Sequence, residues 1–470
     1  MVFSSYLFLF AFLPVALSVY FVCPARWRAH VILGASWLFY GWAQPAFLLL
    51  LVGVSAFTYL VSRQMMRAPV PGTRFRWLTL GVVVNLGTLL YFKYANFAVA
   101  SLNALLGSLH APALAWTQVL LPIGLSFYTF HAISFLVDLY RGQADPPENF
   151  WSFAAFIALF PHLVAGPVLK YHLLAEQFRQ REHSFARFSQ GAQRFMAGFC
   201  KKVLIADMTA PLAVAAYDVP HPLLADAWIG TLAYSVQLFF DFSGYTDMAI
   251  GLALMMGFTF PENFRDPYLA RSITEFWTRW HISLSSWLRG YLYIPLGGNR
   301  RGAGRTSLNL FLTMLLGGLW HGAGWGFVLW GAWNGGFLLL ERVLKRRLGR
   351  PPPPWWYAVP RTMLLVMLGR VFFRSHDFTT SMDVFAALGG LHGGGLSAAF
   401  RLELTPERAV VLVLGVLLVY LLPGWRWLQA RIGAPGRFLI WAEYGLPPLF
   451  LFALALLTVR SYSPFLYFQF

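Results

Sequence analysis

The first apolar run of the chain, residues 3–22, reads FSSYLFLFAFLPVALSVYFV and contains no charged residue. A run of about 20 apolar residues is long enough to cross the hydrocarbon core of a bilayer as a helix. The first basic residues, Arg26 and Arg28, follow the run and do not precede it. We therefore interpret residues 3–22 as a retained first membrane span and not as a cleaved signal peptide.

The composition of the whole chain agrees with this interpretation. Of its 470 residues, 58% are hydrophobic and 12% are charged, whereas a soluble domain carries roughly 25% charged residues. Apolar runs continue to the C-terminus with no polar domain between them, which predicts a single membrane domain over residues 1–470. Cys23 and Cys200 have no CxxC neighbour, so the sequence predicts neither a disulfide framework nor a thiolate metal site.

The apolar runs predict an all-α, polytopic helical bundle with about a dozen spans. Each run is bounded by Pro, Gly or basic residues. The predicted spans are residues 3–22, 30–43, 46–62, 77–92, 118–139, 201–218, 228–257, 307–323, 325–341, 358–374, 408–423 and 438–459.

The distribution of basic residues predicts the topology. Lys and Arg outnumber Asp and Glu by 36 to 19, and they gather in short loops between apolar runs, which is the positive-inside pattern and not a nucleic-acid footprint. If every basic cluster is cytoplasmic, residues 150–168 must enter and leave the membrane on the same side. Pro161 and Pro167 within this segment are typical of such a re-entrant loop. Both termini are then extracytoplasmic, while Arg370 and Arg374 near the far side stay unexplained. The basic clusters are 26–28, 63–76, 141, 179–202, 265–305, 342–361 and 426–437.

One segment differs from the spans, because residues 261–305 are rich in Trp, Tyr, Arg and Asn and contain an amphipathic section at 272–292. Such a segment lies along the interface or folds into the protein. On a continuous helix, Trp277 and His281 would share one face. The sequence leaves open whether His281 belongs to a site or only to an interfacial helix.

Ionisable residues within apolar runs are the first candidates for function. His321 lies in the run LLGGLWHGA, residues 315–323. It could be a structural histidine bonded to a carbonyl, but the glycines beside it predict open volume for a substrate. A neutral imidazole there could take a proton from a hydroxyl as a general base. For Asp241 and Asp247 we favour ion pairing with arginine or helix packing over catalysis.

The basic residues of segment 265–301 allow two interpretations. They could face anionic lipid headgroups, or they could attract a phosphate-rich donor such as coenzyme A. Within this set, Arg279 and Arg300 are our candidates for binding the donor. The sequence contains no phosphate loop, no HExxH and no GxSxG elbow, so a pump or a metallohydrolase has no motif support.

Several motifs stand in a fixed order over nearly the whole chain. They are MVFSS at 1–5, YFKYANF at 91–97, LPIGLSFY at 121–128, FPHL at 160–163, AGP at 165–167, DFSGY at 241–245, ENF at 262–264 and PY at 267–268. The most specific part is residues 274–300, followed by GLWHGA at 318–323. In this order and spacing the motifs resemble the membrane-bound O-acyltransferase (MBOAT) family. One departure is Gly290 in WLRGY, where related sequences often have Asp.

The resemblance implies a bacterial inner-membrane enzyme of the acetyltransferase type, with His321 as the catalytic histidine and His281 as its active-site companion. It implies acetyl transfer from cytoplasmic acetyl-CoA, or another short acyl donor, for O-acetylation of an alginate-like exopolysaccharide. The partners expected are membrane lipid, an extracytoplasmic acetyltransferase protein and the polysaccharide; nucleic acid, a metal and a bound cofactor are not expected. Three alternatives stay open: a secondary transporter, a non-catalytic subunit of an export complex, and an enzyme that acylates lipids or proteins.

Overall fold

The computed structural model describes residues 1–42, 44–349, 353–432, 436–459 and 465. Within these ranges the secondary structure is helical and contains no strand, so the prediction of an all-α protein is confirmed. Parts of the predicted basic loops, at 350–352 and 433–435, lie outside the described residues.

Helices that could cross a membrane are identified by length and hydropathy. Among the described residues, Pro45–Arg67, Pro71–Ser108 and Pro406–Gly424 are long and apolar enough, and Leu7–Val22, Phe378–Leu388 and Tyr444–Val459 are shorter apolar helices. A multi-helical membrane protein is therefore confirmed, whereas the count of twelve spans stays a prediction.

The contacts within the chain group into two compact units, which are described separately although the sequence predicts one domain. The first unit comprises residues 1–192 and 249–260, and the second comprises 193–248 and 261–470. Helices α9 (Phe185–Cys200) and α11 (Leu224–Met255) contribute residues to both units.

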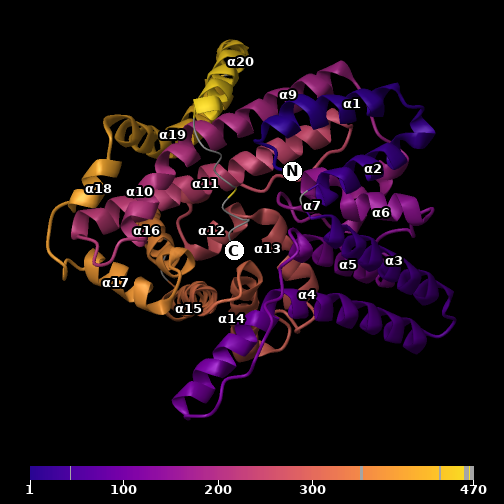
Figure 1. The fold of residues 1–470 in the computed structure, drawn as a ribbon, viewed down its shortest axis with the longest axis horizontal. Helices are drawn as coiled ribbons and strands as arrows, with labels where there is room; N and C mark the ends of the chain where they lie inside the picture. Colours follow the sequence, from indigo (N-terminus) through magenta and orange to yellow (C-terminus); the bar gives the residue numbers. More distant parts are fainter. Residues whose placement is uncertain (43, 350–352, 433–435, 460–464, 466–470) are drawn as a thin grey trace. The chain divides into compact units, whose positions relative to one another are not determined.

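The first unit is built around neighbouring apolar helices, of which α3, α4 and α5 pack against one another (Figure 1). Pro45 and Pro71 stand in the first turns of α3 and α4, where a missing N–H costs nothing. The elements of this unit before α9 are η1 (Leu7–Phe12), α1 (Leu13–Val22), η2 (Ala25–Trp27), α2 (Arg28–Gly41), α3 (Pro45–Arg67), α4 (Pro71–Ser108), α5 (Leu125–Tyr140), α6 (Phe150–Ala158), α7 (Phe160–Leu163) and α8 (Tyr171–Arg179).

The fifth predicted span, 118–139, begins later than the sequence indicates. The segment before α5 is not helical, because side chains of α4 hold it in place through Asn96 to Val119 and Asn103 to Leu114. Gly124 then turns the chain with φ 77°, in a position where a Cβ would lie 2.6 Å from the Leu163 carbonyl oxygen. The helix therefore starts only at Leu125.

The segment predicted to be re-entrant forms two short helices, α6 and α7, broken at Leu159. Asn149 caps α6 by accepting the Ser152 N–H at 2.9 Å. Residues 153–165 are buried throughout. Such burial inside protein suits a broken helix, while its entry and exit on one side of a membrane stay a prediction.

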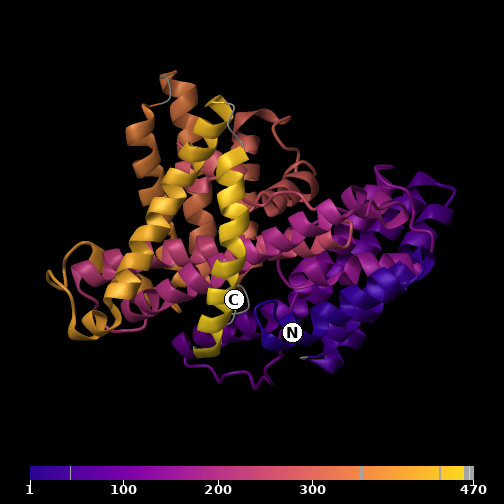
Figure 2. The same cartoon turned by 90° about the horizontal axis from the view of Figure 1, so that it is seen from above.

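The second unit contains the hairpin of α14 and α15, with α16 packed against α15 (Figures 1 and 2). The segment predicted as one amphipathic helix is instead divided into α12, α13 and η5. Besides its parts of α9 and α11, this unit has η3 (Lys201–Ala206), α10 (Asp207–Tyr217), η4 (Pro267–Leu269), α12 (Ile273–Arg279), α13 (Ile282–Leu288), η5 (Arg289–Tyr293), α14 (Gly302–His321), α15 (Trp325–Leu348), α16 (Trp355–Arg374), α17 (Phe378–Leu388), α18 (Ala398–Glu403), α19 (Pro406–Ile432) and α20 (Gly436–Val459).

Candidate functional site

His321 is the last residue of α14, at the tip of the α14–α15 hairpin. The two helices of this hairpin pack so closely that a Cβ on Gly318 would lie 2.3 Å from the Phe327 carbonyl oxygen of α15. A Cβ on Gly322 would lie 2.0 Å from the Phe327 ring. The expectation that these glycines leave open volume is therefore wrong at Gly318 and Gly322, where α15 fills the space. Gly317, by contrast, lines a cavity together with His321.

Aromatic rings surround the His321 imidazole, which is 6% exposed. Its ring centroid lies 5.1 Å from the ring of Trp320, 5.1 Å from Trp330 and 5.4 Å from Phe373. All three rings meet the imidazole edge to face, which is a favourable arrangement for aromatic pairs. The imidazole is thus held by packing at the junction of α14, α15 and α16.

His281 lies between α12 and α13 in the left-handed conformation, with φ 46°. This conformation breaks the helix, so the prediction that Trp277 and His281 share a helix face is wrong. The Asn263 side-chain oxygen accepts hydrogen bonds from the Ser283 N–H at 3.1 Å and the Ser283 hydroxyl at 2.8 Å. It lies 3.2 Å from His281 Nδ1, which must then be the protonated ring nitrogen. Nε2 is left as an acceptor, and it is buried without a hydrogen-bond partner among the described residues.

The structure brings the two predicted histidines together. Their ring centroids are 6.3 Å apart, and Trp320 lies 6.2 Å from His281. His281 is fully buried and does not line the cavities that reach His321. His321 is therefore the histidine that a substrate can contact, and His281 stands beside it.

A cavity of about 1200 Å³ leads to His321 within the second unit. Trp330 and Lys345, which both line it, are fifteen positions apart on α15, so the cavity follows the helix for about 22 Å. Its charged lining residues are Arg271, Glu275, Arg279, Arg289, Glu341, Arg342, Lys345 and Arg361. The basic lining side chains outnumber the acidic ones, so this cavity suits an anionic molecule.

The two predicted donor-binding arginines occupy different places. Arg279 lines the cavity and forms an ion pair with Glu275 at 2.6 Å. Arg300 is exposed and is not a lining residue. Arg289, which belongs to the basic set of segment 265–301, also lines the cavity, as do Arg342 and Lys345, which the sequence analysis did not propose for the donor. None of these three cations has an ion-pair partner in the described part of the chain.

A second, small cavity of about 30 Å³ is also lined by His321 and shares Trp330 with the large one. Arg370 lines it, is only 3% exposed, and donates to the Tyr268 hydroxyl at 2.6 Å. Its guanidinium also lies 5.0 Å from the Trp280 ring centroid. Arg374 pairs with Asp218 at 3.1 Å. These contacts explain why Arg370 and Arg374 can lie near the far side of the predicted membrane topology, where the sequence alone gave no reason for them.

Asp241 and Asp247 form ion pairs, as the sequence analysis favoured. Asp241 accepts from Lys202 at 2.6 Å, so its partner is a lysine and not an arginine. Asp247 binds Arg194 at 2.8 Å and Lys201 at 2.6 Å. Both carboxylates thus hold helices of the second unit together.

Sequence reasoning missed four residues around the histidines: Asn263, Trp330, Arg370 and Phe373. Asn263 lies in the ENF motif that supported the resemblance, but no pattern in the sequence links it to His281. Trp330 and Phe373 belong to other helices, and only the folded chain brings their rings to His321.

Comparison with known proteins tests the resemblance. The model of the membrane-bound O-acyltransferase family matches residues 78–372, which include both histidines and every residue that lines the two cavities except Phe373. The chain belongs to that family. It is therefore an acyltransferase, which favours the enzyme over the transporter and the non-catalytic subunit.

Relatives of this acyltransferase match over most or all of their length. It is 46% identical to a probable alginate O-acetylase of Azotobacter vinelandii over the whole of both chains. It is 50% identical to a probable alginate O-acetylase of Pseudomonas aeruginosa, over 89% of this chain and 81% of that protein. A peptidoglycan O-acetyltransferase of Helicobacter pylori is 34% identical, over 84% of this chain and 81% of the relative.

Proposed function

We propose that this acyltransferase moves an acetyl or other short acyl group from cytoplasmic acetyl-CoA to a hydroxyl of an exported, alginate-like polysaccharide, directly or through an extracytoplasmic partner protein. The observation that carries the proposal is that His321 lines two cavities, one large with a basic lining and one small. A histidine in that position can contact a donor and an acceptor that arrive from different directions.

The large cavity is the proposed donor site. A coenzyme A molecule carries several phosphates, and Arg289, Arg342 and Lys345 offer cations without ion-pair partners among the described residues. Arg279 contributes a further guanidinium, although Glu275 already holds it. The cavity extends about 22 Å along α15, which separates a phosphate-binding mouth from a thioester at His321. The basic clusters of the sequence place this mouth on the cytoplasmic side.

His321 is the proposed general base. Its imidazole takes the proton of the acceptor hydroxyl, and the oxygen attacks the thioester carbon. The carbon–sulfur bond then breaks, the new ester forms, and the leaving thiolate takes the proton from the His321 imidazolium, which returns to its neutral form. The aromatic rings around His321 hold the imidazole in one position, so little reorganisation is needed at the moment of transfer.

His281 acts in this proposal as a positioning residue. Because Asn263 holds the Nδ1 proton, Nε2 can accept a hydrogen bond but cannot donate one in the neutral ring. A hydrogen-bond acceptor at this place can orient an N–H group but cannot polarise the thioester carbonyl. Because His281 does not line the two cavities, the group that it orients is an N–H of a neighbouring ring.

The acceptor and the location rest on the relatives. The proteins similar over most of their length are described as an alginate O-acetylase and a peptidoglycan O-acetyltransferase, so glycan hydroxyls are the acceptor class that we propose. The bacterial inner membrane, with its lipid around the apolar helices, is the proposed location.

The deciding experiment uses purified protein in proteoliposomes with labelled acetyl-CoA. Alginate oligosaccharides, peptidoglycan fragments and a mock acceptor are compared, with and without membrane extract that supplies a partner protein. We expect label on alginate, or on a protein of the extract. Label on peptidoglycan alone would overturn the proposed acceptor, and no donor turnover with any acceptor would overturn acetyl-CoA as the donor.

The proposed topology is tested by single cysteines placed near Arg67, Arg187 and Arg346 in a chain without Cys23 and Cys200. All three sites are expected to be shielded from a membrane-impermeant thiol reagent in intact cells. Labelling at any of them from outside would show that the count of crossings is wrong.

A further inference from the structure

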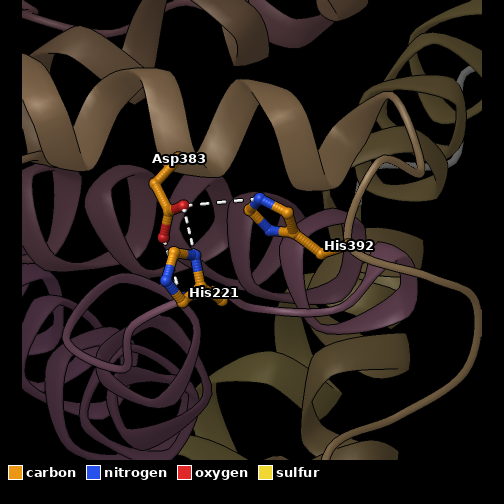
Figure 3. Close-up of side chains that lie close together, drawn as sticks. All are labelled: His221, Asp383 and His392. Carbon is orange, nitrogen blue, oxygen red and sulfur yellow. Dashed lines mark hydrogen bonds and ion pairs between the residues drawn. The ribbon is translucent and has the colours of Figure 1, made fainter.

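Three side chains of the kinds that bind metal ions come together away from His321 (Figure 3). They are His221 between α10 and α11, Asp383 in α17, and His392 in the loop after α17. The Asp383 Oδ1 atom lies 3.0 Å from His221 Nδ1 and 3.4 Å from His392 Nε2. One ligand atom from each residue lies within 4.8 Å of the others. All three belong to stretches that the charge pattern places on the extracytoplasmic side.

The two loops that carry the histidines are fixed to each other by the backbone. The Leu224 N–H donates to the Gly393 carbonyl at 3.1 Å, and the Ala225 N–H donates to the Gly395 carbonyl at 3.2 Å. The Asp226 carboxylate accepts the Ser397 N–H at 3.1 Å. The cluster is thus a built arrangement and not a chance meeting of surface side chains.

The hydrogen bond made by His392 Nδ1 fixes the tautomer of this ring. In the neutral ring the other nitrogen, Nε2, then faces Asp383 without a proton. His392 Nδ1 lies 3.1 Å from the Pro222 carbonyl oxygen and must carry the ring proton of the neutral form. In that form Nε2 and the Asp383 carboxylate oxygen are two acceptors facing each other across 3.4 Å. A cation between them satisfies both. A histidine ligand whose other ring nitrogen donates to a backbone carbonyl is the usual arrangement in metal sites.

His221 is held in a conformation that few residues adopt. Its φ is 52°, in the left-handed region where histidine is more common than most other non-glycine residues. The backbone N–H of His221 donates to Asp383 Oδ2 at 2.8 Å, so Oδ1 is the carboxylate atom left for the ring nitrogens. The His221 side chain is 78% exposed, which leaves room for a further ligand from solvent.

Two of the three distances are close to those of a zinc site. With bonds of about 2.0–2.1 Å, the ligand atoms of a tetrahedral Zn²⁺ site are separated by about 3.3 Å. Asp383 Oδ1 lies 3.0 Å and 3.4 Å from the two imidazole nitrogens, and the ligand atoms of the two histidines lie within 4.8 Å of each other. We propose that His221, Asp383 and His392 bind Zn²⁺, or a similar borderline divalent cation, with water as the fourth ligand. The ion joins the connection before α11 to α17 and to the loop that follows α17, and so acts as a structural clamp on the extracytoplasmic side.

The test uses full-length protein purified with an affinity tag that lacks histidine, stripped with a chelator and returned to metal-free buffer. Zn²⁺ is titrated by calorimetry, Co²⁺ by the visible absorption of its tetrahedral complexes, and the Tm is measured with and without Zn²⁺. We expect one metal per chain, tetrahedral Co²⁺ bands and a Tm that rises with Zn²⁺.

Two variants are designed to keep the fold. His221→Asn retains a residue that tolerates the left-handed backbone, and Asp383→Asn retains an acceptor for the His221 N–H. Each is expected to weaken Zn²⁺ binding at least about 10-fold, because a ligand contributes no less than an outer-shell partner does. His376→Ala is the matched control, since His376 is an exposed histidine bound to Asp218 at 3.2 Å and not to Asp383.

Three outcomes would overturn the metal site. They are absence of Zn²⁺ uptake by the stripped protein, binding that both variants leave unchanged, and equal loss of binding in the His376→Ala control. A Tm that responds to pH but not to Zn²⁺ would replace the metal by a protonated imidazole paired with Asp383.

Discussion

The two histidine clusters of the second unit differ in what surrounds the rings. At His281 and His321, the neighbours are aromatic rings and the neutral side chain of Asn263. At His221 and His392, the neighbour is the Asp383 carboxylate, on loops at the surface. His321 lines a cavity, where an imidazole can exchange a proton with a substrate, whereas two imidazoles that meet one carboxylate suit a cation. Histidine is therefore expected to transfer a proton at His321 and to bind a cation at His221 and His392.

The largest effect is expected when the buried imidazole of His321 is removed, which tests the proposed catalytic role in this comparison. His321→Ala should lower kcat by about 10²–10⁴-fold, which corresponds to roughly 3–5 kcal/mol of barrier. Initial rates of acetyl transfer in proteoliposomes measure the effect, and expression and Tm check the fold. The control is His110→Asn, because His110 is exposed, has φ 56°, and lies outside both cavities. Near-normal transfer by a well-folded His321→Ala protein would return His321 to a structural role.

The second prediction separates the donor cavity from a surface that only faces lipid. Arg342→Gln and Lys345→Gln should each raise the KM for acetyl-CoA about 10–100-fold with a smaller change in kcat, because a charge-assisted contact contributes about 1.5–3 kcal/mol to binding. Arg279→Gln is expected to act in the same direction, but less strongly because Glu275 shares its charge. Arg300→Gln is the control outside the cavity. An unchanged KM for all the cavity variants in neutral detergent would assign these residues to lipid headgroups.

The third prediction concerns the tight α14–α15 hairpin that positions His321. Gly322→Ala should destabilise the protein by about 1–3 kcal/mol, seen as a lower Tm, because the new Cβ meets the Phe327 ring at 2.0 Å. Gly324→Ala is the matched change two residues away, where the nearest atom of the same ring is at the ordinary distance of 3.6 Å. Equal Tm values for the two variants would contradict the tight hairpin.

The smallest expected effect links the two clusters. Stripping metal, or His221→Asn, should lower the Tm but alter kcat by less than about twofold, because the cluster lies outside the cavities that His321 lines. The readout is the transfer rate beside the Tm measured on the same samples. A large loss of kcat without a fall in Tm would mean that the exposed cluster takes part in the reaction itself.

Much of the fold could be predicted from the sequence, because each expected span is an apolar run of helical length. His321 could be identified as well, since an ionisable residue in an apolar run is rare. The break at His281 could not, because it depends on a left-handed backbone that Asn263 stabilises from another segment, through His281 and Ser283. Arg370 looked misplaced for a related reason: its partner Tyr268 is about a hundred residues away in sequence.

The contact of Gly318 with Gly331 has a consequence for genetics. A Cβ on Gly318 would lie 3.0 Å from the Gly331 Cα, and a Cβ on Gly331 would lie 2.7 Å from the Met314 carbonyl oxygen. At each position the new Cβ would press on backbone atoms, which remain in place whatever side chain the neighbouring residue carries. A defect caused by a larger residue at either position cannot be suppressed by trimming its neighbour. Revertants selected from such a strain should restore the original glycine.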